Sequence, residues 1–257
     1  NIGFVLTDEG AVLIDTGIDR TAPRRLAEYL KDALGSRIVA VLNTHAHADH
    51  FGGNSYVVSK FDATVCAPPV EAEIIRSPVL EPLYLAGGKP PAELMGKFIM
   101  GEASPVHHVV TGPLRIGGIE FDPISLPGHS INQVGYMIDR TFFCADVLFP
   151  EEIIKKYGLL YCYDPASHLE TLHKLKEIEA GSFIPGHGKH QEGKPEKLLE
   201  INRKHFFTVE EIIIGHISQP RHTEGVLNVV LEKLKLSLQN YEQYYLCLLY
   251  TSPSPRD

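Results

Sequence analysis

Four side chains of metal-binding type, His45, His47, Asp49 and His50, follow directly after an apolar run. That run, Ile38–Leu42, is rich in β-branched residues, which predicts a buried strand. Residues two apart at a strand end can project the same way, so His45 and His47 can chelate one ion. Asp49 and His50 come as the chain turns and point to a second, adjacent position. The pattern predicts a metal site after this strand, and a solvated histidine-rich turn is the weaker alternative.

Three further candidate ligands stand in similar surroundings elsewhere in the chain. His129 follows a Leu-Pro-Gly run, Asp146 a Phe-Cys-Ala run and His187 an Ile-Pro-Gly run. A lone histidine is more often structural than a ligand. Here, however, the order of strand, small or Pro-Gly residues and then a ligand repeats. We therefore expect all three side chains to lie where strands end.

Five landmarks occur in family order, and together they resemble the metallo-β-lactamase superfamily over about residues 1–190. They are Leu13-Ile-Asp-Thr-Gly17, Thr44–His50, Pro127-Gly-His129, Cys144-Ala-Asp146 and Pro185-Gly-His-Gly188. The resemblance implies an α/β fold, a four-layer αββα sandwich with a C-terminal helical appendage. It further implies that one metal is held by His45, His47 and His129, a second by Asp49, His50 and His187, and that Asp146 bridges both.

The same resemblance implies a metal-dependent hydrolase of the glyoxalase-II-like branch. Imidazole and carboxylate ligands favour two Zn²⁺ ions, with iron or manganese as alternatives. A metal-bridging hydroxide would attack an ester-, thioester- or lactone-type carbonyl. The catalytic roles fall to Asp49, which would orient the nucleophile and shuttle a proton, and to His187. Asp15 and Thr44 are candidates for fixing the ligands in orientation, although both fit equally well as turn residues at strand ends.

Several other functions stay open at this point. They are a metal-dependent nuclease or phosphodiesterase, an iron-dependent persulfide dioxygenase and a β-lactamase. A non-catalytic metal-binding protein is least favoured because the implied ligand set is intact. Lysines in the region 195–246 are interleaved with glutamates, so no basic stripe for a nucleic acid emerges.

We expect a small-molecule substrate, and four residues are candidates for contacting it: Lys155, Lys156, Tyr157 and His190. The two lysines are also explained as a solvated surface pair. The region around them does not match the Cys-Gly-Lys pattern of glyoxalase II, which argues against glutathione thioesters in particular.

The composition excludes some classes of protein. The chain has 257 residues, 44% of them hydrophobic, and a net charge of -8, which indicates a folded globular protein and makes nucleic acid a poor partner. No apolar run reaches about 18 residues, so we expect no membrane span. No signal peptide is visible, and the four cysteines form no C-x-x-C pair. These observations favour reduced thiols and a cytoplasmic location.

We divide the chain into a metallo-β-lactamase-like domain over 1–193, a truncated helical region over 194–246 and a non-native tail over 247–257. The tail resembles a translated sequencing adapter, and an edge strand is expected to be missing before Asn1. Within the first domain we expect a hairpin over 3–15, a helix capped by Thr21, a helix over 51–60 and a helix over 167–180 capped by Ser167. Residues 76–105 lack a period and read as a long loop or lid, and the last helices are expected to break at 219–220.

Overall fold

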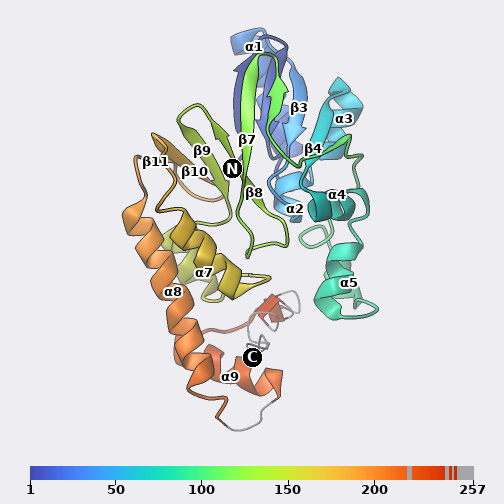
Figure 1. Cartoon of the computed structure of the whole chain (residues 1–257). Coiled ribbons are helices and arrows are strands. Elements are labelled where there is room, and N and C mark those ends of the chain that lie inside the picture. The colour runs from blue at the N-terminus through green and yellow to red at the C-terminus, as the bar shows by residue number, and fades with distance from the viewer. Residues whose placement is uncertain (219–221, 241–242, 245, 248–257) are drawn as a thin grey trace.

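Two β-sheets face each other in the computed structural model, and helices cover the outer face of each sheet (Figure 1). The structure describes residues 1–218, 222–240, 243–244 and 246–247. The first sheet has the order β1 (Gly3–Thr7), β2 (Gly10–Ile14), β3 (Ile38–Leu42), β4 (Thr64–Ala67) and β5 (His108–Val109). The second has the order β11 (Gln191–Glu192), β10 (Ser182–Pro185), β9 (Thr141–Ala145), β8 (Val134–Ile138), β7 (Ile119–Ser125) and β6 (Leu114–Ile116).

Strand direction decides which loops can meet. In the first sheet β1 and β2 form an antiparallel hairpin, and β2, β3, β4 and β5 run parallel. In the second sheet β9 and β10 are parallel, while the other neighbours are antiparallel. The carboxyl ends of parallel strands meet at one edge, and in open α/β sheets this edge carries the ligand sites. The loops after β2, β3, β9 and β10 are therefore placed to converge.

Strand β2 shows how one short sequence serves two cores. Ala11 and Leu13 belong to the apolar cluster beneath the helices of the first sheet, whereas Val12 and Ile14 belong to the cluster between the sheets. The alternation follows from the two-residue period of a strand, and all four side chains are buried because both faces are covered. The predicted αββα sandwich is confirmed.

The helices divide between the two outer faces. Those near the first sheet are α1 (Thr21–Leu34), α2 (Ala48–Phe51), α3 (Asn54–Phe61) and α4 (Pro69–Arg76), followed by α5 (Leu80–Ala86) and a 3₁₀ turn, η1 (Ala92–Met95). Those near the second sheet are α6 (Glu151–Tyr157), α7 (Pro165–Lys174), α8 (Glu196–Ile214) and α9 (Thr223–Leu234). In Figure 1, α7 and α8 lie at the left of the view and α3, α4 and α5 at the right.

Two predicted helix caps are wrong in position. Thr21 is the first residue of α1, and its backbone N–H donates to Asp19 Oδ1 at 2.9 Å. Ser167 lies inside α7, whose cap is Asp164. Pro165 explains the difference, because proline favours the first position of a helix and so places the cap one residue earlier.

Two other expected segments differ from the structure. The helix expected over 51–60 is two helices, since α2 ends at Phe51 and α3 begins at Asn54. Between them a Cβ at Gly52 would clash with the Ile18 carbonyl, so the backbone turns where only glycine fits. The stretch 76–105 is not wholly irregular, because α5 and η1 lie within it.

The C-terminal helices share a core with the second sheet. Leu199 and Phe206 of α8 and Leu227 of α9 belong to the same buried cluster as Phe142 and Cys144 of β9. The four cysteines are buried. Among the described residues, no helix is both long and apolar enough to cross a membrane. The expected break at 219–220 and residues 248–257 of the expected tail lie outside the described residues.

Candidate metal centre

All seven predicted ligands lie beyond the carboxyl ends of four strands. They are His45, His47, Asp49 and His50 after β3, His129 after β7, Asp146 after β9 and His187 after β10. Strand β3 belongs to one sheet and the other three to the second, so the site lies where the two sheets meet at one end. The two-sheet arrangement therefore brings together residues that are more than one hundred positions apart in the chain.

Three imidazoles form the first group of ligands, which we name the histidine group: His45, His47 and His129. Their ring nitrogens all lie within 4.8 Å of one another. His47 Nδ1 lies 3.0 Å from His45 Nε2 and 2.9 Å from His129 Nε2. Since three nitrogens converge on one small volume, the group can hold one metal ion.

A second group, which we name the carboxylate group, consists of Asp49, His50 and His187. One ligand atom of each lies within 4.8 Å of the others. Asp49 Oδ2 is 3.2 Å from His187 Nε2 and 3.9 Å from His50 Nε2. This group is more open, since the side chains of Asp49 and His187 are 42% and 34% exposed.

Asp146 contacts both groups. Its Oδ2 lies 3.6 Å from His129 Nε2 and 3.2 Å from His187 Nε2, and its Oδ1 lies 3.4 Å from His50 Nε2. Asp146 also forms a set of potential ligands with His45 and His50. Its carboxylate therefore lies between the two groups.

The two groups differ in charge. In the histidine group, burial lowers the pKa of His45 and His129 well below the usual value and that of His47 to about 4, and neighbouring imidazoles lower the first two further. Burial also lowers the pKa of His50, but the nearby carboxylates outweigh it and raise the pKa well above normal. The Asp146 carboxylate raises the pKa of His187 to about 9. The imidazoles of the histidine group are thus neutral. In the carboxylate group, His50 and His187 are favoured in the positively charged form because they lie beside carboxylates.

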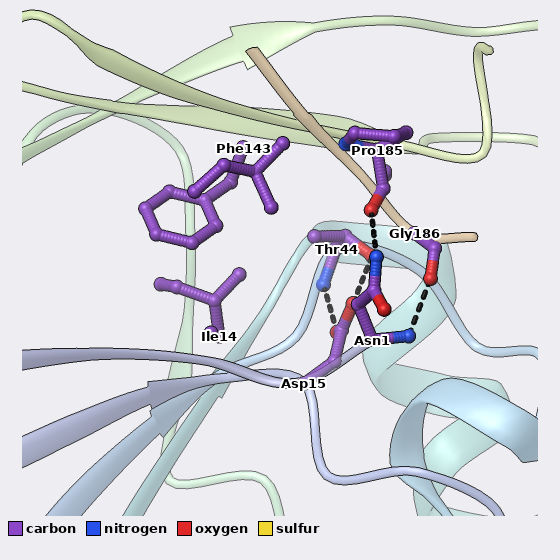
Figure 2. Close-up of a pocket in the computed structure, with 10 residues that line it drawn as sticks. Asn1, Ile14, Asp15, Thr44, Phe143, Pro185 and Gly186 are labelled. Atoms are coloured by element: carbon purple, nitrogen blue, oxygen red, sulfur yellow. Dashed lines mark hydrogen bonds between the residues drawn. The ribbon is translucent and has the colours of Figure 1, made fainter. Parts of the chain in front are cut away.

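Asp15 and Thr44 contact the Nδ1 atoms of two of the imidazoles, those of His50 and His45. Asp15 Oδ2 accepts hydrogen bonds from His50 Nδ1 and Thr44 Oγ1, both at 2.7 Å. Its Oδ1 accepts from the Thr44 backbone N–H at 2.8 Å, and Figure 2 shows Asp15 beside Thr44. Because the Thr44 hydroxyl donates to Asp15, it accepts from His45 Nδ1 at 3.0 Å. Both rings therefore keep Nε2 free to face the centre.

The donor set fits a pair of metal ions. In the part of the chain that the structure describes, His50 Nε2 and Asp146 Oδ1 are buried and have no hydrogen-bond partner, although buried polar atoms normally have one. Both face the centre. Imidazole nitrogens and carboxylate oxygens are ligands that zinc and iron accept.

The backbone approaches the centre closely at Gly186, beside His187. A Cβ at this position would clash with Asp146 Oδ1, so a residue with a side chain does not fit here. The Gly186 N–H donates to the Ala145 carbonyl at 2.7 Å, and the Asn1 side chain donates to the Pro185 carbonyl at 2.8 Å. Figure 2 shows Asn1 beside this loop, which carries His187.

Backbone strain accompanies the site. Asp15 and Ala145, which precedes Asp146, have positive φ angles of 62° and 49°. This left-handed region disfavours residues other than glycine, and such residues gather at functional sites.

Two buried glutamates near the ligands escaped the sequence analysis. Glu71 of α4 accepts hydrogen bonds from the Ala46 backbone N–H at 2.9 Å and from Ser130 Oγ and the Asn132 N–H at 2.8 Å. It joins the loop after β3 to the loop after β7. Glu81 of α5 has its Oε1 3.6 Å from His47 Nε2, and burial raises its pKa to about 8. No local pattern singles them out, since α4 also carries Glu73, which is exposed.

The structure does not bring the four substrate candidates against the ligands. Lys155 pairs with Glu151 at 2.6 Å, and Lys156 Nζ lies 3.1 Å from Tyr157 Oη, all on α6. His190 is exposed and faces Glu192 at 3.9 Å. In the described residues these contacts are local to the surface.

A family model described as the metallo-beta-lactamase superfamily matches residues 1–187. The chain belongs to this superfamily. The match ends at the last predicted ligand, so it spans the whole metal centre. The hydroxyacylglutathione hydrolase of Acaryochloris marina is 40% identical over 188 residues, which are 69% of this chain and 60% of that protein. The chain spans about half the length of the curated relatives it matches.

Solved structures agree with the fold. A beta-lactamase domain protein from Burkholderia ambifaria matches with a TM-score of 0.73 and 19% identity, covering 98% of this chain and 79% of that one. The protein TTHA1623, solved in a di-iron-bound form, matches with a TM-score of 0.54 and 28% identity, covering 75% of this chain and 89% of that one. The first match includes the C-terminal helices in the shared fold.

Proposed function

We propose that the protein is a zinc-dependent hydrolase that acts on an ester-, thioester- or lactone-type carbonyl. The observation that carries the proposal is the pair of three-ligand groups joined by Asp146. In this proposal the histidine group would hold one zinc ion, the carboxylate group would hold the second, and Asp146 would help to hold both. When bound, two zinc ions would acidify a water molecule and stabilise negative charge on the substrate oxygen.

Asp49 and His187 take the catalytic roles in this proposal. Their side chains are the most exposed of the ligand set, so a substrate reaches them first. Burial raises the pKa of Asp49, but the neighbouring His50 and His187 lower it well below normal, which keeps the carboxylate ionised. An ionised Asp49 accepts a hydrogen bond from the attacking water and so orients it, and its expected role in moving the proton stays a prediction. His187 Nε2 lies 3.2 Å from Asp49 Oδ2, so His187 would hold the same zinc ion as Asp49 and keep that carboxylate at the site.

Zinc is favoured by the donor set, because five imidazoles and two carboxylates suit this borderline-soft ion. Iron is the alternative with a specific observation behind it, since the relative at 28% identity was solved in a di-iron-bound form. Persulfide dioxygenase activity would need iron. Metal analysis of the purified protein distinguishes the two ions directly.

The substrate class rests on the relatives. The matched proteins named hydroxyacylglutathione hydrolase support a hydrolytic reaction on a small molecule. A β-lactam is the second candidate, because a solved structure titled BLEG-1 B3 metallo-beta-lactamase is 26% identical with a TM-score of 0.58. Contact of the substrate with Lys155, Lys156, Tyr157 or His190 stays a prediction, as does a cytoplasmic location.

One experiment tests the proposal. Purified protein is assayed on a thioester, a lactone, a β-lactam and a phosphodiester, each with and without a chelator, and its metal content is measured in parallel. We expect about two zinc ions per chain and chelator-sensitive turnover of a carbonyl substrate. Two bound zinc ions without turnover of any substrate would contradict the hydrolase proposal, and phosphodiester turnover alone would replace the substrate class.

A further inference from the structure

Four imidazoles of the metal centre, three buried and that of His47 half-buried, each have one nitrogen that faces away from the other ligands. In three of the four, an oxygen accepts a hydrogen bond from this outer nitrogen. The acceptor is Thr44 Oγ1 for His45 at 3.0 Å, Asp15 Oδ2 for His50 at 2.7 Å and the Tyr161 carbonyl for His129 at 3.1 Å. Such outer bonds fix the tautomer and orientation of a metal-binding histidine.

His47 differs from these three. It faces the other ligands with Nδ1, so its outer nitrogen is Nε2. That nitrogen is buried and has no hydrogen-bond partner among the described residues. The carboxylate of Glu81 faces it, with Oε1 at 3.6 Å.

Glu81 is held in place for this contact. It lies on α5 and is 4% exposed. Tyr84, on the same helix, donates its hydroxyl hydrogen to Glu81 Oε1 at 2.9 Å, and the Tyr161 hydroxyl lies 2.6 Å from that of Tyr84. The Tyr161 ring packs edge-on against the His47 ring, with centroids 4.8 Å apart. Because Tyr84 donates to Oε1, this oxygen remains an acceptor in either protonation state of the carboxyl.

We propose that Glu81 is a positioning residue that accepts the Nε2 proton of His47 and so presents Nδ1 to the metal. A small rotation that closes the 3.6 Å gap to about 2.8 Å completes the hydrogen bond. The inference rests on the metal centre of the proposed function and adds α5 to it. The segment 76–105, expected to be a loop or lid, thus supplies an orienting group for the histidine group.

The test compares substitutions at Glu81 with a matched control. Glu81→Leu removes the acceptor, whereas Glu81→Gln keeps an acceptor oxygen in the same place. Tyr84→Phe leaves Glu81 intact but removes the hydroxyl that aims it. Glu93→Leu is the control, since Glu93 is an exposed glutamate of the same segment.

Two measurements read out the effect. The first is zinc affinity, measured by competition with a chromophoric chelator. The second is the tautomer of His47 in the metal-free protein, measured by nitrogen-15 NMR of the imidazoles. We expect Glu81→Leu to weaken zinc binding about tenfold to a hundredfold and to mix the His47 tautomers. Glu81→Gln should stay within about threefold of the wild type, Tyr84→Phe should lie between them, and Glu93→Leu should change nothing.

The outcomes separate the two proposals. Wild-type zinc affinity and an unchanged His47 tautomer in Glu81→Leu would overturn the role of Glu81. If the wild type binds no zinc and turns over no substrate, the proposed function fails, yet the His47 tautomer still decides the role of Glu81. If Glu81→Leu does not fold, Tyr84→Phe decides: weaker zinc binding with mixed tautomers supports the inference, and wild-type values overturn it.

Discussion

The histidine group and the carboxylate group lie side by side and share Asp146, yet they differ in exposure and in charge. The histidine group is enclosed, and burial keeps its imidazoles neutral, the form in which an imidazole binds a metal. The carboxylate group is partly open, and its two histidines carry raised pKa values beside acidic neighbours. The histidine group is therefore already in the protonation state that binds a metal ion. In the carboxylate group, a metal ion would replace the positive charge of the two histidines. We expect the ion at the histidine group to be the more firmly held.

Removing Asp146 should have the largest effect, because it breaks both groups together. Asp146→Ala takes away the carboxylate that contacts His50, His129 and His187, and leaves the cluster without a bridging oxygen. We expect bound metal to fall well below two ions per chain and kcat/KM to fall by about 10³-fold or more. Metal analysis and steady-state kinetics check this. Full metal content in this variant would show that the two groups are independent.

A substitution at Glu71 tests whether contacts outside the ligand set stabilise the two loops that carry the histidine group. It ties the loop after β3 to the loop after β7, and Glu71→Ala leaves two backbone N–H groups and a serine hydroxyl without their acceptor. Each buried donor left unpaired costs about 1–3 kcal/mol, so we expect the free energy of unfolding to drop by about 3 kcal/mol. Urea denaturation of the metal-free protein measures it.

A matched control lies on the same helix. Glu73 of α4 is exposed and pairs with Arg76 on the surface, so Glu73→Gln should change the stability by less than about 0.5 kcal/mol. Equal losses of unfolding free energy in the two variants would mean that the change acts through helix α4 and not through the hydrogen bonds of Glu71 to the two loops.

Asp15 is the corresponding support of the carboxylate group, since it bonds to His50 directly. Asp15→Asn suits this position, because asparagine tolerates the positive φ of 62° found there. The asparagine side chain allows the same backbone conformation, but one of its two terminal atoms is an amide nitrogen, which cannot accept a hydrogen bond. The three hydrogen bonds that Asp15 accepts are therefore not all kept. We expect zinc affinity to fall about tenfold to a hundredfold at the weaker of two sites. Calorimetric titration resolves the two binding steps, and a loss confined to the tighter site would reverse our assignment.

The sequence predicts where the candidate ligands lie, because each follows a strand within a few residues and such a position is marked by local pattern. His45 and His187 each follow an apolar run that ends in a turn, and that is visible without any tertiary information. Glu71 and Glu81 are different, because their partners belong to distant segments and only packing brings them together. No local pattern in the sequence predicts these contacts.

The helix caps teach a narrower lesson. Both Asp164 and Ser167 are good capping residues, so capping preference alone leaves the start of α7 open. Pro165 removes the ambiguity, since it fits the first position of a helix and cannot donate a hydrogen bond further in. Asp164 directly before Pro165 therefore marks the start of α7, and Ser167 lies in the first turn of that helix.

His168 tests the smallest effect, whether burial alone can keep an imidazole neutral near the histidine group. It is fully buried on α7, packs against Gly128 next to His129, and is not one of the predicted ligands. Its ring lies 4.5 Å from that of Phe206, and burial lowers its pKa from 6.5 to about 4. A depressed histidine pKa means that the unfolded chain binds the proton more readily. The stabilisation is therefore complete above pH 6.5 and is lost as the pH falls toward 4.

For the metal-free protein, His168 should account for about 1 kcal/mol of the stability lost between pH 7 and pH 5.5. His168→Phe replaces the ring by one that cannot titrate, so its stability should fall less over the same range. Urea denaturation at several pH values measures the difference between the two proteins, in which the other histidines cancel. Parallel curves would show that His168 keeps its proton affinity when buried, and the neutrality of the histidine group would then need a cause other than burial.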